Sequence, residues 1–246
     1  MSYNSFAEYY DRLMEDARYP ERCRYILNIA RRFGHDMGRT LDLCCGTGSL
    51  TLELARCGVD VFGIDRSGEM LSEAMQKSIA EGRHILFAQQ SMERLRLPEL
   101  IDTCVCTLDS LNHLTDIGDV RSTFERLARS MKAGGMFIFD VNTVYKHREV
   151  LADNVFVMEN ERVFCVWQNF PREDDITDIA LDFFVEENGV YTRFSEDFSE
   201  RAYSGEELEK LLDEAGFDVA AVYGDLSFEP PGADEQRTVY VAVKRQ

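Results

Sequence analysis

Short apolar runs alternate with stretches of helical spacing along much of this chain. Seven runs are typical of buried strands: 40–43, 59–65, 85–89, 101–107, 136–142, 217–223 and 238–243. Between the first five of them, apolar residues recur every three or four positions, which predicts helices. This strand–helix alternation indicates an α/β fold with a mostly parallel sheet. No apolar run approaches the about 20 residues that a membrane-spanning helix needs.

Beyond the fifth run the apolar spacing changes to every second position, which is typical of half-buried strands. Within this part, the dipeptide Asn188-Gly189 favours a tight hairpin turn. We therefore expect an antiparallel insertion of three or four strands at residues 151–202. It interrupts an α/β domain formed by residues 1–150 and 203–246.

The start of the chain also has a helical pattern. Apolar residues recur at helical spacing across residues 4–34, and Pro20 suits the first turn of a second helix. The first residues lack the basic stretch and apolar core of a secretory leader. We therefore expect helices in residues 1–38 and a cytoplasmic protein.

The strand at 40–43 runs through a glycine turn directly into a predicted helix. Gly46 and Gly48 have no Cβ, so the backbone there can bend sharply and approach a ligand closely. The N-terminus of the following helix leaves backbone N–H groups without partners in the helix. Strand, turn and helix together predict a corner that holds a nucleotide or nucleoside.

Three side chains near this corner narrow the choice of ligand. Thr51 stands where dinucleotide-binding proteins have a small third residue. Asp42 ends the strand, where a carboxylate repels a pyrophosphate and suits a cationic ligand such as a sulfonium. Asp65 ends the second strand 19 residues after Gly46, near the about 20 expected for an acid that binds ribose hydroxyls. An NAD-type nucleotide-dependent oxidoreductase shares the strand, turn and acid, and is the first alternative.

The sequence from Leu41 to Gly48, Leu-Asp-Leu-Cys-Cys-Gly-Thr-Gly, resembles the first motif of class I S-adenosylmethionine-dependent methyltransferases. That motif reads hydrophobic-Asp-hydrophobic-Gly-Cys-Gly-Thr-Gly, so Cys44 replaces its first glycine and the backbone there must tolerate a Cβ. The resemblance implies a doubly wound, mostly parallel seven-stranded Rossmann-like sheet whose last strand is antiparallel. It also implies S-adenosyl-L-methionine as the cofactor, a helical cap at residues 1–38, and the β insertion over the active site.

The same resemblance assigns the cofactor contacts. Asp42 and the glycine turn receive the methionine part, and Ser91 with Met92 receives the adenine, although the family usually has an aspartate at the position of Ser91. Asp65 receives the ribose. The expected cofactor-binding residues are Tyr10, Arg22, Asp42, Cys44, Gly46, Gly48, Asp65, Met70, Ser91, Met92, Leu108 and Asp109. For Tyr10 and Arg22, a tyrosine at the edge of the core and a solvated arginine are equally good interpretations.

The loop after the fourth predicted strand, Asp109-Ser110-Leu111-Asn112-His113, resembles the Asp-Ser-x-Asn-Tyr/His loop of a subgroup that methylates small molecules. His113 is placed to act as a general base, or else it orients the loop or packs on the cofactor. Asn112, His113 and Asn142 are the expected substrate contacts. The alternatives are that Asp109 and Asn112 brace the loop and that Asn142 caps the next helix.

Composition argues against nucleic acid as a partner, against disulfides and against a metal site. The formal net charge of −18 argues against nucleic acid, whose phosphates need clustered Lys and Arg. The seven cysteines have no framework spacing and are typical of small buried residues in a reducing compartment. The four histidines are dispersed, so we expect no metal site.

We therefore expect an S-adenosylmethionine-dependent methyltransferase that moves a methyl group by in-line displacement to a small-molecule acceptor. A non-catalytic sensor that binds S-adenosylmethionine is the second alternative. The sequence leaves open which acceptor is used, whether nitrogen, oxygen or carbon is methylated, and the oligomeric state.

Overall fold

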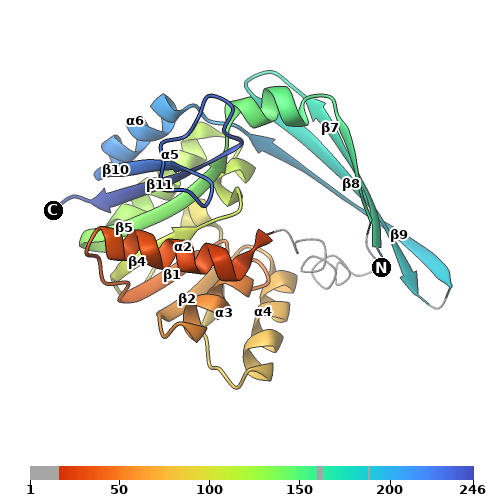
Figure 1. Ribbon diagram of the computed structural model, residues 1–246. Helices are drawn as coiled ribbons and strands as arrows, with labels where there is room; N and C mark the ends of the chain where they lie inside the picture. The colour runs from red at the N-terminus through yellow and green to blue at the C-terminus, as the bar shows by residue number, and fades with distance from the viewer. Residues whose placement is uncertain (1–16, 160–162, 188) are drawn as a thin grey trace.

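Two β-sheets make up the frame of the protein (Figure 1). The computed structural model describes residues 17–159, 163–187 and 189–246. A seven-stranded sheet has the order β10-β11-β5-β4-β1-β2-β3, and a separate four-stranded sheet has the order β6-β7-β8-β9. The predicted fold class, a mostly parallel α/β sheet with an antiparallel β addition, is confirmed.

The seven-stranded sheet is parallel except at one strand. Its strands are β1 (Arg39–Leu43), β2 (Asp60–Asp65), β3 (Phe87–Gln89), β4 (Ile101–Cys106), β5 (Met131–Asn142), β10 (Phe217–Gly224) and β11 (Arg237–Lys244). Strand β11 pairs antiparallel with both β5 and β10, as expected for the last strand. The parallel strands therefore place their carboxyl ends along one edge, where the loops that follow them meet.

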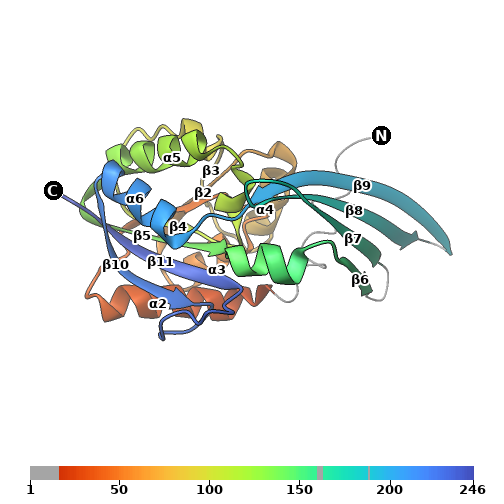
Figure 2. The ribbon, with the colours of Figure 1, turned by 90° about the horizontal axis from the view of Figure 1, so that it is seen from above.

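Helices cover both faces of this sheet (Figure 2). They are α2 (Tyr19–Arg32), α3 (Ser49–Arg56), α4 (Gly68–Ala80), α5 (Ile117–Ser130) and α6 (Gly205–Ala215), with the short helices η2 (Met92–Arg94), η3 (Ser110–His113) and η4 (Lys146–Leu151). One apolar cluster joins α2 and α3 to the sheet, and a second joins α5 and α6 to it. Because apolar residues pack on both faces of the sheet, the loops at the carboxyl ends of its strands are attached to a rigid core.

Local signals in the sequence set the helix ends. Ser204 and Glu207 form a capping box at the start of α6, and Gly216 ends that helix with a left-handed φ of 92°. Ser67 caps α4 by accepting a hydrogen bond from the amide of Met70. Asp116 caps α5 in the same way, by accepting a hydrogen bond from the amide of Gly118.

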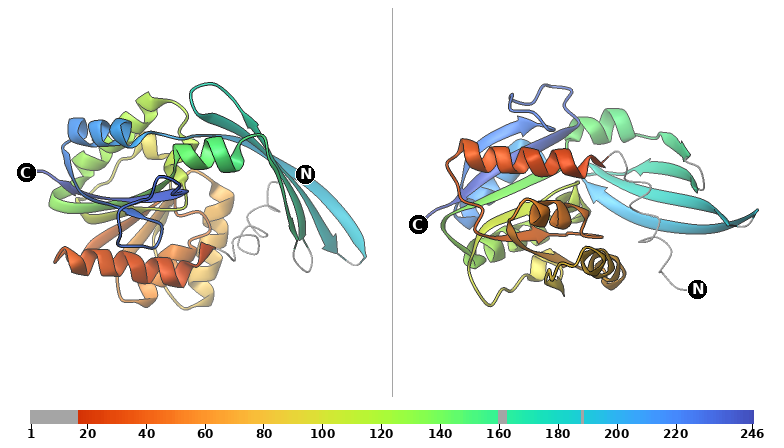
Figure 3. Two further views of the ribbon diagram at one scale, coloured as in Figure 1. Left: turned by 45° about the horizontal axis from the view of Figure 1, so that its top comes forward. Right: turned by 60° about the horizontal axis from the view of Figure 1, so that its bottom comes forward.

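The second sheet is fully antiparallel and extends away from the α/β core (Figure 3). Its strands are β6 (Val155–Glu159), β7 (Val163–Pro171), β8 (Ile176–Glu187) and β9 (Val190–Arg201). One face carries a buried apolar cluster, from Val163 and Cys165 of β7 to Phe183 of β8. Of the expected hairpin dipeptide, Gly189 has a φ of 80°, and Asn188 lies outside the described residues.

Several expected features lie outside the description or differ from it. Tyr10 and the first predicted helix belong to residues 1–16, which the structure does not describe. Strand β5 begins at Met131 instead of residue 136, because its first residues pair with β4 before an irregularity in the register. All seven cysteines are free, and of these only Cys57 is exposed. Among the described helices, none is long and apolar enough to cross a membrane.

Candidate active site

Three residues of the turn between β1 and α3 have the backbone geometry of a corner that holds a ligand. Cys44 has a φ of 62°, a left-handed conformation that explains why a glycine is the usual residue here. Gly46 also has a positive φ, and a Cβ built on it would meet no atom within 4 Å. A Cβ on Gly48 would lie 2.8 Å from the Cβ of Ala74, so that glycine is needed for packing. The turn is therefore tight beneath Gly48 and open above Gly46.

Asp65 at the end of β2 holds this turn in place. One carboxylate oxygen accepts a hydrogen bond from the amide of Gly46 at 2.8 Å, and the other accepts one from the amide of Ser67 at 2.8 Å. The residue is 9% exposed. The acid that the spacing predicted as a ribose contact thus lies beside the open side of the turn and already orders it.

Asp42 lies beneath the turn instead of at its surface. It is 2% exposed, and its carboxylate accepts a hydrogen bond of 2.5 Å from the hydroxyl of Thr51. Burial raises the pKa of Asp42 to about 7, although the Thr51 hydrogen bond opposes the shift. A contact between Asp42 and a cationic ligand stays a prediction.

The expected adenine side of the corner is less polar. Ser91 precedes η2 and is partly exposed, whereas Met92 is buried at 7% exposure. Met70 in the first turn of α4 is partly exposed. These residues border the corner from β2 and β3, where the sequence placed them, and their contacts with a ligand stay predictions.

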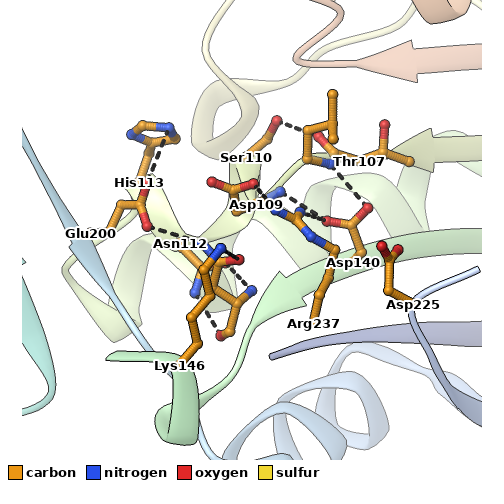
Figure 4. A network of polar contacts seen from close by, with 12 residues as sticks. Thr107, Asp109, Ser110, Asn112, His113, Asp140, Lys146, Glu200, Asp225 and Arg237 are labelled. Atoms are coloured by element: carbon orange, nitrogen blue, oxygen red, sulfur yellow. Dashed lines mark hydrogen bonds and ion pairs between the residues drawn. The ribbon is translucent and has the colours of Figure 1, made fainter. Parts of the chain in front are cut away.

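The loop after β4 is held by a buried carboxylate of β5 (Figure 4). Asp140 is 1% exposed and accepts hydrogen bonds from the amides of Leu108 at 3.0 Å and Asp109 at 2.8 Å. Leu108 and Asp109 have φ values of 59° and 54°, so both are left-handed without being glycine. Such a conformation costs about 1 kcal/mol or more per residue and persists only where neighbouring groups impose it.

Arg237 at the start of β11 joins Asp140 of β5 to Asp109 of the loop. Its Nη1 lies 2.6 Å from Asp140, and its Nη2 lies 2.6 Å from Asp109. Burial raises the pKa of Asp109, but the charges of Arg237 and Lys146 outweigh burial and hold that pKa well below its ordinary value. Asp109 is therefore ionised at neutral pH.

Arg22 of α2 points toward the same network. Its Nη1 lies 3.0 Å from Asp225 and 3.3 Å from Asp140. It is 5% exposed, and its Nε has no hydrogen-bond partner among the described residues. Arg22 is thus a buried, paired side chain and not a solvated one, and its role as a cofactor contact stays a prediction.

Asn112 and Asn142 connect three elements. The amide of Asn112 donates to the carbonyl oxygens of Asn142 at 3.1 Å and Arg201 at 2.8 Å, and its oxygen accepts from the backbone N–H of Asn142 at 2.9 Å. The side chain of Asn142 donates to Glu200 at 3.2 Å and accepts from Lys146 at 2.9 Å. Asn112 is fully buried, which favours the alternative that it braces the loop.

His113 lies at the open side of this group, next to strand β9. Its Nε2 is 3.9 Å from Glu200, and its ring centroid is 5.0 Å from that of Phe198. About a third of its side chain, 32%, is exposed, whereas Glu200 is 3% exposed. On the other side of Glu200 lies the buried His147, whose Nε2 is 3.6 Å from the carboxylate.

The sequence did not single out Glu200, Arg237 or Lys146. Glu200 belongs to an acid-rich stretch that reads as a solvent-exposed surface, and Arg237 is one charge at the start of an apolar strand. Only the pairing of β9 and β11 with their neighbours brings them to the loop. A weak signal was available for Glu200, because it continues the alternating pattern of Phe194, Glu196 and Phe198 on β9.

Comparisons with known proteins agree on one family. A methyltransferase domain model matches residues 40–135. The chain is 37% identical to the putative methyltransferase YqeM of Bacillus subtilis (strain 168) over 99% of this chain and 98% of that protein. It resembles the crystal structure of an S-adenosylmethionine-dependent methyltransferase from Clostridium acetobutylicum ATCC 824, with a TM-score of 0.91, 33% identity and 99% coverage of each chain.

A third similarity concerns the fold alone. The sugar N-methyltransferase KedS8 from Streptoalloteichus sp ATCC 53650 superposes with a TM-score of 0.80 at 19% identity, over 97% of this chain and 92% of that one. Because the match spans nearly the whole chain, it includes the second sheet as well as the α/β core.

Proposed function

This chain belongs to the class I S-adenosylmethionine-dependent methyltransferases, and we propose that it methylates a small-molecule acceptor. The observation that carries the proposal is the meeting of Glu200, from the second sheet, with His113 and Asn142 at the carboxyl ends of β4 and β5. There the insertion at residues 151–202 contributes a charged group beside the donor corner.

The donor corner fits S-adenosyl-L-methionine. A Cβ built on Gly46 would meet no atom of the described residues within 4 Å, so a ligand can approach the backbone there. In this proposal the turn from Cys44 to Gly48 holds the methionine part and Asp65 the ribose. When bound, S-adenosylmethionine supplies a methyl group that its sulfonium already activates. The protein therefore needs to align donor and acceptor and exclude water, which is a proximity effect.

His113 is needed as a general base only for some acceptors. Where the acceptor arrives protonated, a base must remove the proton before the nucleophile attacks, and His113 is the exposed imidazole of this group. His113→Ala is then expected to leave donor affinity unchanged and to lower turnover.

The acidic surface supports a small acceptor over a nucleic acid. A net charge of −18 repels a phosphate backbone, and the sugar N-methyltransferase that shares the fold acts, by its name, on a sugar. Both points favour an acceptor that is not a polyanion.

Isotope labelling tests this function. Purified protein is incubated with S-adenosylmethionine labelled in its methyl group and the small-molecule fraction of a cell extract, and mass spectrometry identifies labelled products. A labelled product formed only with active protein is expected. Tight binding of S-adenosylhomocysteine without any labelled product would instead indicate a non-catalytic sensor.

A further inference from the structure

Three ionisable side chains converge where an acceptor would meet the donor corner. One ligand atom each from Asp109, His113 and Glu200 lies within 4.8 Å of the other two. They come from the loop after β4, from η3 and from β9, so the group exists only because the second sheet reaches the core (Figure 4).

Glu200 offers one carboxylate oxygen to a ligand. It is 97% buried, since only 3% is exposed, and Asn142 donates to its Oε2 at 3.2 Å. Its Oε1 has no hydrogen bond from any described residue, and the His113 Nε2 that it faces is 3.9 Å away. This Oε1 atom is not among the fully buried polar atoms that lack a partner in the described residues, so a hydrogen-bonding ligand can reach it.

The charges around this group leave room for one positive charge. Asp109, Asp140 and Glu200 supply three negative charges against the two positive charges of Arg237 and Lys146. Arg22 is balanced by Asp225 nearby. Over these five charged side chains of the described residues, the excess is a single negative charge. A monovalent cation would neutralise it, whereas a divalent cation would reverse its sign.

The spacing also suits an ammonium better than a metal. Neighbouring ligands of Mg²⁺ are about 3 Å apart, because its bonds are about 2.1 Å long and meet at right angles. Two acceptors of one ammonium lie about 4.6 Å apart when each hydrogen bond is about 2.8 Å. The distance from His113 to Glu200 is 3.9 Å, and the widest pair is within 4.8 Å.

One aromatic side chain, Phe198, lies beside this group of three residues. Phe198 lies two residues before Glu200 on β9, on the same face of the strand, and its ring packs against that of His113. An aromatic face attracts a cation within about 6 Å of its centroid. Phe198 would therefore hold the carbon atoms next to a bound ammonium group.

We propose that the methyl acceptor is an amine, which binds as an ammonium group between Asp109, His113 and Glu200 beside Phe198. The inference rests on the proposed function and names its substrate class. His113 takes one proton from the ammonium and leaves a neutral amine. The amine nitrogen then turns its lone pair toward the methyl carbon and forms the new C–N bond. The bond between the methyl carbon and sulfur breaks, and its electron pair stays on the sulfur.

Selective blocking of amines tests the substrate class on the unmodified protein. The small-molecule fraction is divided, and one half is treated with the N-hydroxysuccinimide ester of acetic acid, which acylates amines, and is then quenched. Loss of the labelled product in the treated half is expected, with the label located on nitrogen by tandem mass spectrometry. A product that survives the treatment overturns the inference and leaves the proposed function intact. No labelled product in either half contradicts the proposed function itself.

Two variants locate the amine at Glu200. Glu200→Gln keeps the shape and removes the charge, so the KM of the amine that the labelling identifies should rise about tenfold or more. Its Kd for S-adenosylhomocysteine should not change. Asp197→Asn makes the same charge change on the opposite, exposed face of β9 and should alter neither value. If Glu200→Gln weakens S-adenosylhomocysteine instead, the carboxylate serves the donor and the inference is wrong.

A chelator separates the ammonium from a metal ion. Activity in excess EDTA should equal activity with added Mg²⁺ or Mn²⁺. Activity that EDTA abolishes and Mn²⁺ or Mg²⁺ restores would assign the group to a metal and overturn the amine site. Where Glu200→Gln fails to fold, the blocking and chelator experiments still decide.

Discussion

The guanidinium of Arg237 lies 2.6 Å from the carboxylate of Asp140, and this contact ties the antiparallel strand β11 to the loop that follows β4. Asp140 in turn accepts hydrogen bonds from two left-handed residues of that loop. The shape of the acceptor side thus depends on a residue near the end of the chain.

Asp140→Asn should destabilise the protein strongly. The amide leaves the buried charge of Arg237 without its carboxylate and turns a donor toward one backbone N–H, which together cost about 3–5 kcal/mol. Urea unfolding measures the loss. Asp213→Asn, which breaks the exposed ion pair with Arg245, should cost less than about 1 kcal/mol. Similar losses in the two variants would show that Asp140 is not the support of the loop.

Cys44 should prefer glycine over alanine. Both substitutions remove the sulfur, but only glycine adopts a φ of 62° without strain. We expect Cys44→Gly to be more stable than Cys44→Ala by about 1 kcal/mol. At Cys57, where φ is −79°, the same pair should favour alanine. Thermal unfolding of the four variants measures both differences, and the same order at both positions would rule out strain at Cys44.

Asp42 should make the stability of the protein without ligand depend on pH. Burial raises its pKa from 3.8 to about 7, so between these values the folded state binds more protons than the unfolded state. Stability from this group is therefore fully present below pH 3.8 and is lost as the pH rises toward 7.

Asp42→Asn removes that titration. Relative to the variant, the unmodified protein should lose up to about 1.4 kcal/mol per pH unit between pH 5 and pH 7. Urea unfolding of both proteins at the two pH values measures the difference. A difference that stays constant with pH would mean that Asp42 is ionised in the folded protein throughout this range.

Asp65→Ala should weaken donor binding at least about tenfold, because it removes a charged acceptor for ribose hydroxyls and also the support of the Gly46 amide. Calorimetry with S-adenosylhomocysteine gives the Kd. Asp60→Ala, on the same strand but in an exposed ion pair with Arg39, should leave the Kd unchanged. Equal affinity in the two variants would remove the ribose assignment.

Periodicity and turn chemistry were sufficient to predict the strands and their mostly parallel α/β arrangement, whereas the antiparallel last strand was implied by the family resemblance. The strands of the core, their mostly parallel arrangement and the separate antiparallel strands follow from residues that are close in the sequence. The glycine turn was also predictable, because a strand, two glycines and a helix are consecutive. Even the strain at Cys44 could be anticipated, since a cysteine replaces a glycine in an otherwise matching motif.

The acceptor side was harder to predict because its contacts are long-range. Glu200 and Arg237 reach the loop at residues 108–113 only through the register of β9 and β11, which no local pattern specifies. Long-range contacts also change the interpretation of Asn112. Its type and loop position suggested a substrate contact, yet tertiary partners occupy its side chain.

The alternation along β9 suggests how relatives of this protein could exchange one substrate for another during evolution. Phe198 and Glu200 occupy the same face of β9, so a dipeptide inserted at the start of that strand would move the aromatic ring of Phe198 into the place of the carboxylate. The donor corner lies on other strands and would keep its shape through such an event. A lineage could thus acquire a new substrate preference in one genetic step, with the methyl-donor machinery inherited unaltered.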